Sequence, residues 1–189
     1  MTFSYLPDHA GFETALISWL EQCAFLPGGS VRFGQQIGGR PDRPYGLITM
    51  ISGGAVDGID AEHQEYNAVT DNLDTIVYGP RQMTVQVEVF TTDAVELVDV
   101  KTGARNKMNA ALAGLRIPAM KQLFQEAGLA FQQVLSGPRE ADEQLGARWE
   151  RRMIADLAFG YTSVFSDVAA ADAANWIETA DDPIITSEV

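Results

Sequence analysis

The stretch from Arg148 to Phe165, RWERRMIADLAFGYTSVF, decides the fold. Side chains along it alternate between two faces, which is the period of a β-strand. Most strands have about five or six residues, so this run predicts one unusually long strand. Four charged residues share one face of its first half: Arg148, Glu150, Arg152 and Asp156. We expect that part of the strand to be solvated or to lie at an interface.

Shorter strands are predicted before this run. Four segments have the β-branched or alternating pattern of a strand: Tyr45–Ile51, Asn72–Tyr78, Met83–Phe90 and Leu129–Leu135. Gly79-Pro80 is expected to turn the chain, which would make the second and third of them an antiparallel hairpin. Ser136-Gly137-Pro138 is expected to end the fourth, and a short strand or turn is expected around Trp176-Ile177.

Helices are predicted where apolar residues recur at helical spacing. The first runs from about His9 to Cys23 with Asp8 as its N-cap. A second starts at Asp93 and continues to Leu115, and a short third runs from Ala119 to Ala127. Pro118 suits the first turn of the third helix, and Gly128 suits its end. The order of elements predicts an α+β fold: a mainly antiparallel sheet with helices packed on one face and a long C-terminal strand hairpin.

Two connections and one tail complete the predicted organisation. Residues 26–44 are rich in Gly and Pro and are typical of a loop. Residues 53–75 are polar and acidic, with little periodicity, and predict an extended loop. We interpret residues 1–180 as a single α+β domain and residues 181–189 as a flexible acidic tail.

Length and composition exclude several classes of protein. The chain has 189 residues, 46% of them hydrophobic, and a formal net charge of -13. That length is ample for a hydrophobic core. The acid excess argues against static nucleic-acid binding, which needs clustered Lys and Arg. No apolar run predicts a membrane span or a signal peptide, and Cys23 is the only cysteine. We therefore expect a soluble protein of a reducing compartment.

The charge is unevenly distributed. Residues 44–80 and the chain after Arg152 contain acids and no Lys or Arg, whereas Lys101 to Arg152 holds nine bases against five acids. One interpretation is that these are solvated faces that keep the protein soluble. The other is that acidic and basic patches meet head-to-tail between identical subunits.

Residues suited to catalysis or metal binding are few. His9 and His63 are the only histidines, and neither has a metal-ligand companion at close spacing. The Gly-rich segments lack the features of a phosphate-binding loop, and the acids near Asp57 do not follow the order of an EF-hand. We predict no catalytic, cofactor-binding or metal-binding residues. A small-ligand-binding or hydrolytic α+β domain using His63 and nearby carboxylates is the alternative from a different class.

Several short motifs occur in an order and at a spacing that is similar to a known family. They are Arg43-Pro44-Tyr45, Tyr78-Gly79-Pro80-Arg81-Gln82, Asp93-Ala94, Ala127-Gly128-Leu129, Ser136-Gly137 and Trp149-Glu150-Arg151-Arg152. With the strands and helices that they flank, they cover most of residues 9 to 179. The chain thereby resembles the bacteriophage neck and tail-completion proteins, specifically the tail-terminator group.

This resemblance implies a structural virion protein of the tail or neck, assembled in the host cytoplasm. Such proteins form a ring, typically a hexamer, at the head-proximal end of the tail. The ring stops tail-tube polymerisation and joins the tail to the neck or capsid. The implied partners are further copies of the chain, the tail-tube protein and the neck or head-completion proteins. DNA would pass through an acidic channel without specific binding, because like charges prevent it from sticking. A head-completion or adaptor ring, or a baseplate ring, is the nearest structural alternative.

Two sets of residues are the candidate contacts of such a ring. Arg148, Glu150, Arg152 and Asp156 are expected at a subunit interface or facing the lumen. The acids of the predicted loop are expected to contact the tail tube or a neck neighbour: Asp57, Asp60, Glu62, Glu65, Asp71 and Asp74.

Overall fold

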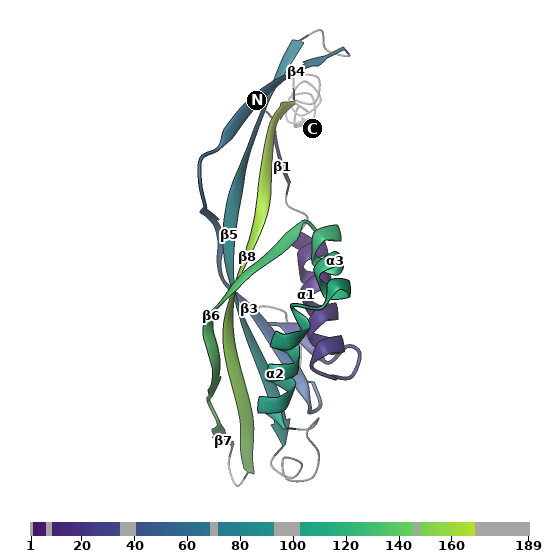
Figure 1. The fold of residues 1–189 in the computed structure, drawn as a ribbon, viewed down its shortest axis with the longest axis vertical. Coiled ribbons are helices and arrows are strands. Elements are labelled where there is room, and N and C mark those ends of the chain that lie inside the picture. The colour runs from purple at the N-terminus through teal and green to yellow at the C-terminus, as the bar shows by residue number, and fades with distance from the viewer. Residues whose placement is uncertain are drawn as a thin grey trace, which may run out of the picture. The chain divides into compact units, whose positions relative to one another are not determined.

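A computed structural model gives the fold (Figure 1). It describes residues 2–6, 9–34, 41–68, 72–92, 103–145 and 148–168, without the side chains of 2–9, 67, 72, 92, 143–149 and 165–168. The chain packs as two compact units. Unit 1 comprises Met1–Pro7, Gly58–Pro80 and Thr162–Val189, and unit 2 comprises Asp8–Asp57 and Arg81–Tyr161. The prediction that residues 1–180 form a single domain stays a prediction.

The three helices of the described residues belong to unit 2. They are α1 (His9–Cys23), α2 (Ala104–Gly114) and α3 (Pro118–Glu126). The predicted bounds of α1 are confirmed, and α3 has Pro118 in its first turn and Gly128 at a positive φ of 75° after its end. Asp8 and residues 93–102 lie outside the described residues, so the predicted N-cap of α1 and the predicted start at Asp93 do too. The prediction of one helix that runs through Gly103 to Leu115 is wrong, because Gly103 has an extended backbone (φ -74°, ψ 147°) and α2 begins after it.

The sheet is mainly antiparallel, which confirms the predicted α+β class. Its strands are β1 (Thr2–Leu6), β2 (Val31–Phe33), β3 (Tyr45–Val56), β4 (Ala61–Asn67), β5 (Asn72–Thr92), β6 (Leu129–Glu140), β7 (Glu143–Leu145) and β8 (Arg148–Val168). The hydrogen-bonded order is β1-β8-β5-β3-β2, with β4 on β5 and both β6 and β7 on β8. Only β2 and β3 pair in parallel among the registers of the described strands. The long strand predicted from Arg148 is confirmed as β8.

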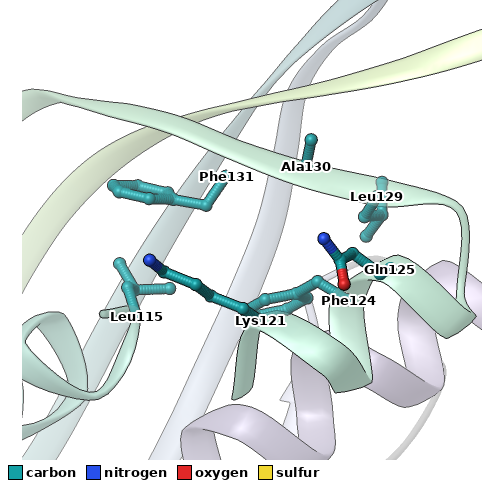
Figure 2. Close-up of a pocket in the computed structure, with 7 residues that line it drawn as sticks. All are labelled: Leu115, Lys121, Phe124, Gln125, Leu129, Ala130 and Phe131. Atoms are coloured by element: carbon teal, nitrogen blue, oxygen red, sulfur yellow. The ribbon is translucent and has the colours of Figure 1, made fainter. Parts of the chain in front are cut away.

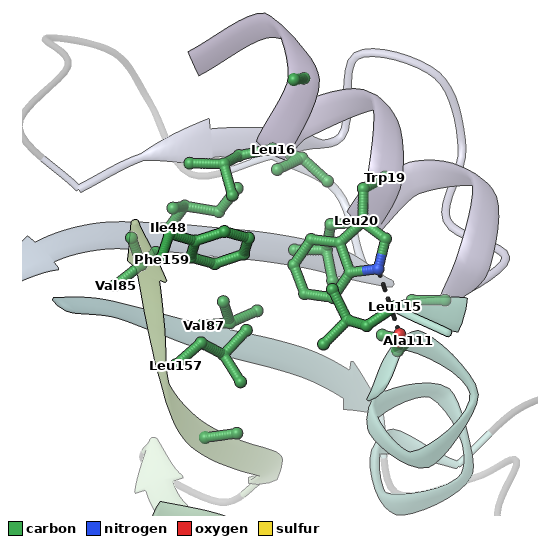
Figure 3. Close-up of a cluster of buried hydrophobic side chains, with 14 of the residues drawn as sticks. Leu16, Trp19, Leu20, Ile48, Val85, Val87, Ala111, Leu115, Leu157 and Phe159 are labelled. Carbon is green, nitrogen blue, oxygen red and sulfur yellow. Dashed lines mark hydrogen bonds between the residues drawn. The ribbon is translucent and has the colours of Figure 1, made fainter. Parts of the chain in front are cut away.

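In unit 2 the helices cover one face of the sheet (Figure 1). Met83, Val85, Val87 and Val89 of β5 alternate with more polar residues and are buried beneath the helices, as their period predicts. Figure 3 shows Leu16, Trp19 and Leu20 of α1 meeting this layer together with Phe159 of β8. The indole N–H of Trp19 donates to the carbonyl of Ala111, 3.1 Å away, which ties α1 to α2.

Unit 1 is built from strands in its described part. β1 pairs with the end of β8, from Leu6 opposite Val164 to Thr2 opposite Val168. β4 pairs with the first part of β5, from Ala61 opposite Tyr78 to Asn67 opposite Asn72. We call this second pair, residues 61–78, the acidic hairpin.

Three predicted breaks in the strands are wrong. The predicted extended loop 53–75 instead contains the end of β3, all of β4 and the start of β5. Gly79-Pro80 does not turn the chain, because β5 continues through it. Residues of β5 up to Tyr78 pair with β4, and residues from Arg81 onward pair with β3, so Pro80 lies where β5 changes partner. Ser136-Gly137-Pro138 does not end β6, which passes through it with a shift of register before Arg139.

Two further differences are smaller. β2 lies within the predicted loop 26–44 and adds a short parallel strand beside β3. The predicted turn around Trp176-Ile177 and the predicted flexible tail 181–189 lie outside the described residues.

Candidate assembly surfaces

Glu150 of β8 is the centre of a buried ion pair in unit 2. It alternates with core residues, so β8 directs its side chain to the sheet face opposite the helices. Its carboxylate accepts from Arg43 Nε at 2.8 Å and from the hydroxyl of Tyr45 at 3.3 Å. Only 1% of the Glu150 side chain is exposed. Of the two expected environments, the solvated one is wrong for Glu150, because Arg43 and Tyr45 cover the carboxylate and the Arg43 guanidinium neutralises its charge; the interface stays a prediction.

Arg152 makes a second pair on the same face. Its guanidinium holds Glu88 of β5 with two hydrogen bonds, from Nε at 2.9 Å and from the terminal nitrogen at 2.7 Å. The guanidinium carbon also lies 5.4 Å from the ring centroid of Phe90, which stacks on Tyr45. These contacts join β3, β5 and β8 through charge and aromatic packing.

Asp156 is the third anion of this face. It accepts hydrogen bonds from Arg139 at 2.7 Å and from Gln86 at 2.9 Å. Burial by itself would raise the pKa of the Asp156 carboxyl, but the hydrogen bonds from Arg139 and Gln86 and the charge of Arg139 together hold that pKa below its ordinary value. Asp156 is therefore ionised at neutral pH and paired within its own chain.

The acidic hairpin of unit 1 has two faces of different character. Cross-strand neighbours share a face, so Glu62, Tyr66, Leu73 and Val77 lie on one side, which we call the Tyr66 face. Glu65 and Asp74 are directly opposite each other on the other side, which we call the reverse face. Tyr66 and Leu73 are also directly opposite each other, and they are 59% and 62% exposed. The hairpin thus presents an apolar pair on one face and two like charges on the other.

The remaining acids of the predicted contact loop are dispersed. Asp57, in unit 2, accepts a hydrogen bond from Gln132 of β6 at 3.2 Å. Asp60 and Glu62 are exposed in unit 1, and Asp71 lies outside the described residues. The structure therefore brings Glu62, Glu65 and Asp74 together on one hairpin and places Asp57 in the other unit.

A hollow on unit 2 lies between α3 and β6. Figure 2 shows Lys121 and Phe124 of α3 facing Leu129 and Phe131 of β6 across a cavity of about 150 Å³. A second hollow shares Phe131 and continues along Arg116, Gln133 and Val134. In the part of the chain that the structure describes, no ion pair joins Arg116 or Lys121 to another residue. We call these two hollows together the Phe131 groove.

Comparison with known families decides the identity of the chain. The model of a family described as phage neck terminator protein matches residues 10–188, which is nearly the whole chain. The chain belongs to the phage neck terminator family. The resemblance to tail terminators is thereby confirmed at the level of the family. No curated protein matches the chain.

Membership of the phage neck terminator family supports a structural component of the virion neck. His63 lies on the reverse face of the hairpin opposite Ile76, and no cluster of three or more potential metal ligands occurs among the described residues. Burial raises the pKa of the Cys23 thiol, which disfavours the nucleophilic thiolate. No helix in the described ranges is both long and apolar enough to cross a membrane.

The interface roles predicted from this neck terminator sequence remain predictions. The side chain of Arg148 lies outside the described residues, and Glu150, Arg152 and Asp156 are paired inside their own chain. Sequence reasoning missed their partners Arg43, Glu88 and Arg139. Glu88 stands at a polar position of an alternating strand, which is a weak signal. Arg43 is 107 positions from Glu150, and no local pattern connects them.

Proposed function

We propose that this neck terminator assembles into a homo-oligomeric ring, a hexamer, at the head-proximal end of a phage tail. The ring ends polymerisation of the tail tube, joins the tail to neck or head-completion proteins, and surrounds a channel for DNA. It forms from chains made in the host cytoplasm. The family match over residues 10–188 is the observation that carries this proposal.

The charge of the chain supports the part of the proposal that concerns DNA. A net charge of -13 repels a polyanion, so DNA can pass without being held. Glu65 and Asp74 concentrate like charge on the reverse face of the hairpin. Such a pair is unfavourable across two strands unless it faces water or a cationic partner. The exposed acids of the hairpin are accordingly our candidates for contact with the tail tube or a neck neighbour.

The charged residues of β8 have a supporting part in this proposal. Arg148 is our candidate for a contact with a neighbouring subunit or the lumen. The ion pairs of the other three residues, Glu150, Arg152 and Asp156, join neighbouring strands of the sheet. We propose that these pairs hold the strands in place and thereby stabilise the surface around them. A ring also needs two different complementary patches on each subunit, and the separation of acidic and basic segments provides them.

Assembly with tail tubes tests the proposal. The purified chain is added to polymerising tube protein, and particles are sized by light scattering and imaged by negative-stain microscopy. We expect rings at one tube end and tubes that stop growing. A chain that stays monomeric and leaves tube growth unchanged would contradict the proposal. Rings located only at a baseplate would assign the chain to the other end of the tail.

A further inference from the structure

We propose that the acidic hairpin of one copy docks into the Phe131 groove of a second copy, with Tyr66 and Leu73 on either side of Phe131. This inference rests on the proposed ring, and it names the two surfaces that would join its subunits. A docking of this kind is head-to-tail, because the hairpin and the groove are different surfaces of the same chain, and repeated head-to-tail contacts can close a ring.

The first support is the apolar surface that each partner exposes. Tyr66 and Leu73 form an exposed cross-strand pair on the Tyr66 face. In the groove, Phe131 is partly buried and Val134 is 41% exposed, whereas Phe124 and Leu129 behind them are core residues with 1% and 2% exposure. The hollow next to Lys121 measures about 150 Å³, which is the size of an apolar cavity that holds a benzene-sized ring. The side-chain ring of Tyr66 is about as large as benzene.

The second support is complementary charge. Glu62 lies on the Tyr66 face, about 13 Å along the strand from Tyr66, and it is exposed. Arg116 and Lys121 line the two hollows of the groove and make no ion pair in the described part of the chain. Residues 57–78 contain six acids and no base, whereas residues 103–125 contain no acid and four bases, of which Arg105 pairs with Glu140 and Lys107 is buried, so Arg116 and Lys121 carry the positive charge of the groove. Docking would therefore bring Glu62 to the cations of the groove.

The third support is the division of the hairpin into two faces. Only the Tyr66 face carries the exposed apolar pair, and burying the reverse face would desolvate the exposed Glu65 beside the half-buried Asp74. With the Tyr66 face against a second copy, the reverse face stays available for water, DNA or the tail-tube protein. The inference is thus compatible with tail-tube or neck contacts of Glu65 and Asp74, and it assigns Glu62 to the neighbouring subunit instead.

Variants on the two faces of the hairpin test the inference. Tyr66→Ala and Glu62→Lys change the Tyr66 face, and we expect each to weaken self-association of the full chain about tenfold or more in sedimentation or mass photometry. Tyr78→Ala and Glu65→Lys are the matched controls on the reverse face, and we expect them to leave self-association within about twofold of the wild type. Equal effects on both faces would overturn the inference.

A charge exchange separates loss of contact from loss of folding. Lys121→Glu alone should weaken association like Glu62→Lys alone, whereas the two changes in one chain should restore rings. Arg32→Glu, an exposed base on β2, is the control that should not be restored by Glu62→Lys. If the double variant stays as weak as the single ones, the pairing is wrong.

The outcomes also separate this inference from the proposed ring function. If the wild type forms rings and Tyr66→Ala does so equally well, the docking inference fails and the ring stands. If Glu62→Lys forms normal rings that no longer cap tubes, the Tyr66 face binds the tube protein, which overturns the inference. If the wild type forms no ring with tubes present, the proposed function itself fails.

Discussion

The two units use the same strands in different ways. In unit 2, β5 buries Met83, Val85, Val87 and Val89 under three helices. In unit 1, residues 73–80 of the same strand are mostly exposed or half-buried, and the described residues include no helix to cover them. A sheet face is stable when another layer packs on it. Unit 2 carries the buried core, whereas the acidic hairpin is the part that would gain most from the docking proposed above.

A substitution in the core of unit 2 should cause the largest loss in the free energy of unfolding. Phe159 is fully buried and contacts Phe124 and Phe131, so Phe159→Ala should lower the free energy of unfolding by about 4 kcal/mol. Leu73→Ala, at an exposed position of the hairpin, should change it by less than about 0.5 kcal/mol. Urea unfolding of both variants measures the difference. A loss of similar size for both would break the distinction between the units.

Breaking the buried Arg152–Glu88 ion pair should cause the second-largest loss in the free energy of unfolding. Arg152→Met leaves Glu88, of which 4% is exposed, without its bidentate partner. The expected cost is about 3 kcal/mol, because an uncompensated buried charge is expensive. In the Glu88→Gln background the same change should cost much less. Additive costs in this double-mutant cycle would show that the pair does not act as a unit.

An added side chain where α2 packs tightly against α1 should cause the third-largest loss in the free energy of unfolding. A Cβ on Gly114 would lie 2.8 Å from Cys23 Cβ, so Gly114→Ala should destabilise unit 2 by about 2 kcal/mol through overpacking. Cys23→Gly removes the obstructing atoms and should reduce that cost. Gly137→Ala is the control, since nothing lies within 4 Å of the added atom. Thermal unfolding that ranks Gly137→Ala as the more harmful change would refute this packing.

The smallest expected effect is the contribution of ionised Asp156 to folding stability, which depends on pH. The pKa of Asp156 is lowered in the folded protein, so its ionised form stabilises the fold above the ordinary aspartate pKa and this contribution is lost as the pH falls through the lowered value. Asp156→Asn should therefore cost about 1 kcal/mol at pH 7. That difference should shrink once the pH falls below about 3.9. Urea titrations at several pH values measure it, and a difference that grows on acidification would contradict the assignment.

Sequence patterns predicted the elements whose period is regular. The alternation of β8 and the apolar stripe of α1 gave both elements correctly, because one face of each is buried. β4 was missed because its sequence, AEHQEYN, lacks β-branched residues and its described side chains are all exposed. The sequence predicts a turn at Gly79-Pro80, because the change of partner along β5 that occurs there is a tertiary feature.

The candidate surfaces were predictable only in part. The acids of residues 57–74 were evident from the sequence, but their division between two hairpin faces follows from the pairing register. The Phe131 groove has no signal in the sequence, since α3 and β6 become its walls only through packing. The pairing of Arg43 with Glu150 is likewise a long-range contact.

Hydrogen exchange tests the difference between the units most directly. The full chain is labelled while dilute and monomeric and again after assembly with tail tubes, and peptides from residues 61–78 and 83–91 are compared. We predict that residues 83–91 exchange slowly in both states, because the core covers them. Residues 61–78 should exchange rapidly in the monomer and slowly in the assembly. Slow exchange of residues 61–78 in the dilute monomer, or exchange unchanged by assembly, would contradict the account.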